Sequence, residues 1–193
     1  MNKAKKIIIK AFQREKRKER GLRTITPNDE LAKAHIKKAR HNLTVMNDLN
    51  DLGHTDWLVV VAYYAMYHGS TAILARIGLD SKDHATTTAV LEYFFSEYID
   101  NELLKKFNEL KEKKENLERL IIDDKFLNYL WSSKNLRETA QYGTSTFITK
   151  SEESISHAKE FILKIRSLLE KLDEDYVKML VEQIKELCNQ LPF

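Results

Sequence analysis

Glycine, proline and cysteine are scarce in this 193-residue chain, which contains five Gly, two Pro and one Cys. So few turn-forming and helix-breaking residues favour long helices over a turn-rich sheet, and we therefore predict an all-α protein. The lone Cys188 cannot form a disulfide within the chain, and no histidine lies at a spacing typical of a zinc site. We accordingly expect no metal, no other cofactor and a reducing, cytoplasmic setting.

Long hydrophobic runs are also few. Near the N-terminus the longest apolar run is Ile7–Ile9, which is too short for the core of a signal peptide. Between Trp57 and Leu79 the only charged residue is Arg76, but tyrosine, histidine, serine and threonine fill the middle of the segment, unlike a membrane span. We predict a buried central helix there and no contact with a membrane.

Acidic residues are scarce at the start of the chain. Residues 1–24 hold ten of the 32 Lys and Arg but two of the 29 Asp and Glu, which leaves 22 basic and 27 acidic residues in the remainder. Residues 1–25 are therefore predicted to form a basic N-terminal arm or helix. Two interpretations stay open: the arm contacts RNA or an acidic partner, or it is a solvated and frayed terminus.

Apolar residues recur at steps of three and four through the rest of the chain, which indicates amphipathic helices. The pair Thr26–Pro27 predicts the start of the first, Gly78 the end of the second and Asp83 the start of the third. Further helices are predicted over 103–121, 124–141, 149–172 and 174–190, with a loop over 143–151. No glycine-rich phosphate loop or internal repeat is present. We predict a helical bundle at 26–172 and an additional C-terminal helix at 173–193.

The segment DWLVVVAYYAMYHGSTAILARIGLDSKDH, residues 56–84, resembles the second helix and following turn of HEPN domains (higher eukaryotes and prokaryotes nucleotide-binding). The resemblance extends back to HIKKARHNL and forward to NLRETAQYG and ISHAKEFILKIRSLL, so that it covers roughly residues 28–172. It implies an antiparallel bundle of four or five helices that forms a homodimer. Many members are metal-independent endoribonucleases, often the toxin that pairs with a small nucleotidyltransferase in a toxin–antitoxin system.

The family's nuclease motif is an Arg followed after four to six residues by a His. Arg137 matches the Arg, but Tyr142 stands five positions later, so the His is missing. Imidazole titrates near neutral pH and can take the proton of a 2′-hydroxyl, whereas a phenol with a pKa of about 10 does so poorly. The resemblance therefore implies a nucleotide- or RNA-binding module with a degenerate motif. The alternative is an active endoribonuclease that uses Arg137 and Tyr142, with the pKa of Tyr142 lowered by the nearby Arg.

Two further groups of residues are candidates for ligand binding. Trp131, Lys134 and Arg137 lie at helical spacing, which suits stacking on bases and contacts to phosphate, and equally suits a dimer interface. In the second group, His68 and His84 lie where the resemblance is best and would line a cleft with Tyr64 and Tyr67. Its alternative is that the two histidines are hydrogen-bonded core or capping residues. A purely structural role in oligomerisation is also compatible with the sequence.

Overall fold

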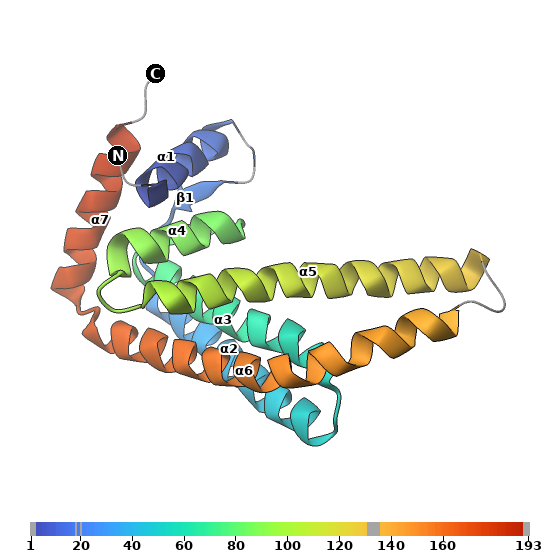
Figure 1. The fold of residues 1–193 in the computed structure, drawn as a ribbon. Coiled ribbons are helices and arrows are strands. Elements are labelled where there is room, and N and C mark those ends of the chain that lie inside the picture. Colours follow the sequence, from blue (N-terminus) through green and yellow to red (C-terminus); the bar gives the residue numbers. More distant parts are fainter. Residues whose placement is uncertain (1–2, 18, 20, 131–135, 191–193) are drawn as a thin grey trace.

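Seven helices and a two-stranded sheet make up the part of the chain that the structure describes (Figure 1). The structure is a computed structural model that describes the chain except residues 1–2, 18, 20, 131–135 and 191–193, and the side chains of 55–56 and 117–153 are not described. The elements are α1 Lys3–Lys16, β1 Leu22–Thr24, α2 Asp29–Asp51, α3 Thr55–Arg76, β2 Leu79–Ser81, α4 His84–Phe95, α5 Asn101–Leu130, α6 Leu136–Lys171 and α7 Glu174–Asn189. The prediction of an all-α helical bundle is confirmed.

The long apolar helix α3 lies at the centre of the bundle. It packs most extensively against α2 and also against α5 and α6, and its residues Leu58, Met66 and Ile73 are fully buried. The segment Trp57–Arg76 is long and apolar enough to cross a membrane, but 72% of it is buried inside the protein. The predicted buried central helix is therefore confirmed.

Short polar side chains set the first turns of two helices. Asp83 precedes α4, and its carboxylate accepts a hydrogen bond from the amide of Thr86, as the sequence predicted. Helix α2 begins later than predicted, because Asn28 rather than Thr26 caps it. The side-chain oxygen of Asn28 accepts a hydrogen bond of 2.8 Å from the amide of Leu31.

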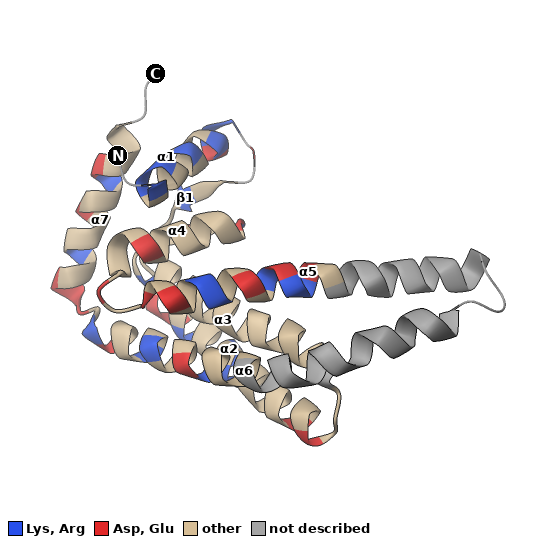
Figure 2. Cartoon of the chain, in the orientation of Figure 1, with Lys and Arg blue, Asp and Glu red and all other residues tan. Residues whose placement is uncertain are grey.

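The basic N-terminal segment is a helix that belongs to the core. Helix α1 packs against α4. Its charged residues are mostly Lys or Arg, drawn blue in Figure 2. Its buried residues recur every three or four positions: Ala4, Ile8, Ala11 and Phe12. The interpretation of this segment as a solvated, frayed terminus is therefore wrong, because burial of this apolar face stabilises the helix against fraying.

Two short strands connect the end of α1 to the end of α3. Strand β1 pairs antiparallel with β2, in the register Leu22 with Ser81, Arg23 with Asp80 and Thr24 with Leu79. Three residues per strand are too few to show a two-residue alternation, so the sequence pattern did not predict the pair.

Helices α5 and α6 have different bounds from those predicted. Helix α5 continues to Leu130, and α6 runs from Leu136 to Lys171 without the predicted loop at 143–151. The predicted loop and the predicted start of a helix at 124 are therefore wrong, because both lie inside continuous helices. Residues 131–135 of the helix predicted over 124–141 lie outside the described residues. A glycine inside a helix costs about 1 kcal/mol relative to alanine, which is too little for Gly143 alone to end a helix that no proline interrupts.

Candidate functional site

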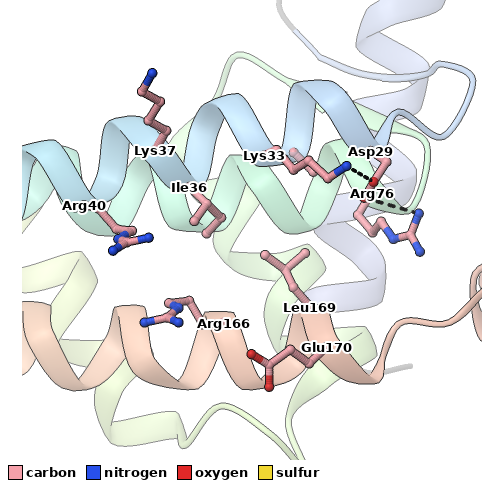
Figure 3. A pocket seen from close by; sticks show the side chains of 10 residues that line it. Asp29, Lys33, Ile36, Lys37, Arg40, Arg76, Arg166, Leu169 and Glu170 are labelled. Carbon is pink, nitrogen blue, oxygen red and sulfur yellow. Dashed lines mark ion pairs between the residues drawn. The ribbon is translucent and has the colours of Figure 1, made fainter.

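A groove of about 590 Å³ lies between α2, the C-terminal end of α3 and the C-terminal part of α6 (Figure 3). Its apolar part is formed by Ala32, Ile36 and Leu169. Charged residues complete the lining: Lys33, Lys37, Arg40, Arg76, Arg166, Asp29 and Glu170. Five cations against two carboxylates make this groove attractive to an anionic ligand.

The periodicity of two helices brings these side chains together. On α2, Lys33, Lys37 and Arg40 follow one another at steps of four and three, which places them on one face of the helix. On α6, Arg166 and Glu170 are four residues apart and share the opposite wall. Between the two rows of charges, Ile36 and Leu169 point toward one another (Figure 3).

Asp29 holds two of the cations at one end of the groove. Its carboxylate lies 2.8 Å from Nζ of Lys33 and 3.5 Å from Nη1 of Arg76. The hydrogen bond from Lys33, with the charges of Lys33 and Arg76, keeps the pKa of Asp29 below its ordinary value despite some loss of hydration. Arg76 also donates a hydrogen bond of 2.8 Å to the carbonyl oxygen of Leu172. Lys33 is therefore engaged within α2, while Arg76 connects α2, α3 and the end of α6.

Arg40 and Arg166 are the two cations that are placed to meet a ligand. They extend into the groove from opposite helices, whereas Lys37 points away from it (Figure 3). Both are exposed, and neither forms an ion pair with any other residue that the structure describes. A guanidinium group donates two parallel hydrogen bonds to phosphate oxygens. Each wall of the groove thus offers one guanidinium group that can bind phosphate.

The predicted site residues did not include this groove. The sequence could have predicted one wall of the groove, because Lys33, Lys37 and Arg40 share one face of a helix. Arg166 lies 126 positions beyond Arg40 in the sequence, and no local pattern connects the two. Only the packing of α6 beside α2 makes them neighbours.

The predicted nuclease motif lies outside the described side chains. Arg137 and Tyr142 belong to α6, but side chains are described in this helix only from Ser154 onward. Trp131 and Lys134 lie outside the described residues altogether. The groove is formed by a later part of α6, at Arg166.

Two of the predicted ligand-binding residues lie on α3, outside the groove lining. Tyr64 is partly exposed, and Nζ of Lys114 lies 5.2 Å from the centre of its ring. His68 faces His35 of α2, with the two Nδ1 atoms 3.1 Å apart. One ring must donate its proton and the other accept it, and burial lowers the pKa of both histidines.

The third predicted residue, His84, is buried in the core with hydrogen-bond partners on both ring nitrogens. Its Nε2 donates to Oδ1 of Asn108 at 2.8 Å, and the hydroxyl of Tyr63 lies 3.4 Å from Nδ1. The ring of Phe107 packs against it edge-on, with centroids 4.4 Å apart. Burial lowers the pKa of His84, and the hydrogen bond to Asn108 only partly opposes this effect. This arrangement favours the neutral imidazole.

We predict that the protein loses stability below neutral pH, because three of its partly or fully buried histidines have lowered pKa values. Because the folded-state pKa values of His35, His68 and His84 lie below the ordinary value, the unfolded chain takes up protons first as the pH falls through about 6.5. The free energy of unfolding should therefore decrease from pH 7.5 to pH 5. Urea denaturation at both pH values measures the change. The carboxylates of Asp29 and Asp83 do not contribute to it, because their lowered pKa values keep both groups ionised over this pH range.

A variant identifies the source of this pH dependence. Replacing His84 with Gln removes one of the three titrating groups, so the difference in urea midpoint between the two pH values should become smaller. A midpoint that is equal at pH 7.5 and pH 5 in the unmodified protein contradicts the prediction.

The comparisons with known proteins agree with this architecture. The family model of the HEPN domain matches residues 32–189, from α2 to the end of α7, and thus well over half of the chain. The match continues through α7, beyond the roughly 28–172 over which the sequence resemblance was seen, and leaves out α1 and β1. No curated protein matches the chain. Within the side chains that the structure describes, no three His, Cys, Asp or Glu are grouped to hold a metal ion. As the sequence resemblance predicted, the chain belongs to the HEPN domain family, whose members are nucleotide- or RNA-related, nuclease-like modules.

Proposed function

We propose that this HEPN protein binds RNA or nucleotides through their phosphates and does not cleave them. The observation that carries the proposal is the pair Arg40 and Arg166, which face one groove from two helices and have no acidic partner among the described residues. Phosphate groups supply most of the affinity in binding that is independent of sequence. A groove with this excess of positive charge fits such a ligand better than a neutral or cationic one.

The composition of the nuclease motif supports binding without cleavage. A metal-independent ribonuclease needs a group that accepts the proton of the 2′-hydroxyl near neutral pH. The chain has Tyr142 where the family motif has its His after Arg137. A phenol remains protonated at neutral pH unless its surroundings lower its pKa by several units, so Arg137 on its own would contact phosphate and leave it intact.

We also propose that the protein forms a homodimer and pairs with a small nucleotidyltransferase. Membership of the HEPN family supports both parts of this proposal. Light scattering on the purified chain should give twice the monomer mass of 22.6 kDa. Co-expression with a nucleotidyltransferase encoded next to it should yield a complex on size exclusion, and two separate peaks would contradict the pairing.

Replacing both Arg40 and Arg166 with Gln should weaken RNA binding at least about tenfold. Gln keeps much of the length of the side chain but removes the charge, and the loss of about 1.4 kcal/mol is already tenfold in affinity. Charge-assisted hydrogen bonds contribute about 1.5–3 kcal/mol each. Fluorescence anisotropy with a labelled mixed RNA pool in EDTA measures the affinity, and a gel of the same samples detects cleavage.

A second double variant controls for net charge. Lys178 and Lys185 on α7 are exposed and each is paired with an acid of the same helix, so changing both to Gln removes the same charge away from the groove. This control should bind as the unmodified protein does. Equal affinity of the groove variant and the control refutes the groove as the binding site. Cleavage that disappears in Arg137→Ala would instead establish a nuclease that works without the motif His.

A further inference from the structure

Helix α1 presents an exposed row of cations on the side opposite its buried face. Lys3, Lys6 and Lys10 follow at steps of three and four, and Arg17 comes seven residues later in the turn after the helix. We call these four residues the basic stripe; all four are exposed. The three lysines extend over about 10 Å of the helix axis at the usual rise of about 1.5 Å per residue.

Among the described residues, no nearby acid compensates the charge of the three lysines of the basic stripe. By contrast, three exposed lysines on other helices, Lys33 on α2 and Lys178 and Lys185 on α7, each lie within 3.1 Å of an acid three or four residues away. Residues 3–14 contain no acid at all, and within the part of the chain that the structure describes no ion pair involves Lys3, Lys6 or Lys10. Figure 2 shows the contrast between α1 and the mixed colours of α5 and α7.

The helix that bears the basic stripe is held firmly on the body of the protein. Nη2 of Arg14 donates to the carboxylate of Asp83 at 3.0 Å, which ties α1 to the capping residue of α4. At Gly21 the chain turns so close to α1 that an added Cβ would collide with the carbonyl oxygen of Ala11. Because these contacts set the position of the helix before binding, its cations need little reordering to meet a ligand.

We propose that the basic stripe is a second contact surface for the RNA backbone, separate from the groove and added to the HEPN domain by a helix that lies outside the family match. That the ligand is RNA rests on the proposed function. Three exposed cations on a fixed helix, with a fourth in the turn that follows it, neutralise phosphates and release counterions, which adds affinity without sequence preference.

An anionic membrane fits this surface less well than RNA does. A helix that lies on a membrane inserts an apolar face between the lipids, but the apolar face of α1, with Ile8 and Phe12, is already buried in the protein. What remains outside is a row of charges. An acidic protein could bind the same lysines, and competition with polyglutamate distinguishes it from RNA.

The test replaces Lys3, Lys6 and Lys10 together with Gln and measures binding of single-stranded RNA at several salt concentrations. Each phosphate contact that is lost lowers the slope of log affinity against log salt by about 0.7 for single strands. The triple variant should therefore bind at least about fivefold more weakly than the unmodified protein, with a slope smaller by about two. The control is Lys164, Lys178 and Lys185 to Gln, which removes the same charge from lysines that are paired with acids. Circular dichroism confirms that α1 stays helical.

The outcomes separate this inference from the proposed function. If the stripe variant binds as the control does while Arg40→Gln with Arg166→Gln loses binding, the inference is wrong and the groove proposal stands. If binding depends on the stripe alone, the groove proposal is wrong and the inference stands. Absence of RNA binding by the unmodified protein overturns both. Displacement of the RNA by polyglutamate at an equal concentration of charge overturns RNA as the partner and indicates an acidic protein.

Discussion

Replacing Phe107 with Ala should lower the free energy of unfolding by about 3–5 kcal/mol. The side chain is fully buried on α5. Its ring lies 4.4 Å from that of His84, 5.6 Å from that of Tyr63 and 5.4 Å from that of Phe161, measured between centroids. These three residues belong to α4, α3 and α6, so one truncation leaves a cavity where four helices meet.

Urea denaturation monitored by circular dichroism measures this loss, with Lys105→Ala, at an exposed position of the same helix, as the matched control. Phe107→Leu should cost far less, because it retains most of the volume. The truncation also removes the ring that covers His84, so the midpoint should depend less on pH between 7.5 and 5. A loss below about 1 kcal/mol would show that α5 is not packed at this point as the structure has it.

Replacing Gly69 with Leu should lower the free energy of unfolding by about 1–3 kcal/mol. Gly69 lies where α3 crosses α6, and a Cβ added there would come within 2.6 Å of Cδ1 of Ile162 and 3.6 Å of Cγ1 of Ile165. A single extra methyl can be accommodated if Ile162 changes rotamer, but a Leu side chain has to push the two helices apart. Overpacking of this kind moves the backbone and spreads the strain.

A compensating substitution tests this explanation. In a Gly69→Leu background, Ile162→Ala vacates the space that the new side chain needs, so the double variant should be more stable than the sum of the two single changes predicts. Gly69→Ala should have a small effect, because the clash with one terminal methyl is offset by the higher helix propensity of alanine. Additive effects of Gly69→Leu and Ile162→Ala in the double variant would show that the two positions do not share a packing site.

Several features of this protein could be predicted from the sequence because they depend on neighbours along the chain. The scarcity of Gly and Pro indicated the helical class, and the apolar run from Trp57 marked α3 as the central helix. Asp83 identified the start of α4, since a capping side chain binds an amide only three residues away. The resemblance at residues 56–84 identified the HEPN family, which the family match confirms. The same local reasoning failed at Gly143, where a weak helix-breaking signal was outweighed by the continuous helix α6.

The helical class, the central helix α3, the cap of α4 and the family were thus determined by the sequence alone. The tertiary structure decided which helix faces meet. The apolar side of α1 is buried against the protein, and its basic side is therefore held in a fixed position on the surface. It also placed Arg166 opposite Arg40, and tied Arg76 to the end of α6 through the carbonyl oxygen of Leu172. The physical reason is that helix periodicity specifies a face but not its partner. The partner is selected by complementary packing between segments far apart in the sequence, such as those that carry Arg40 and Arg166, 126 residues apart.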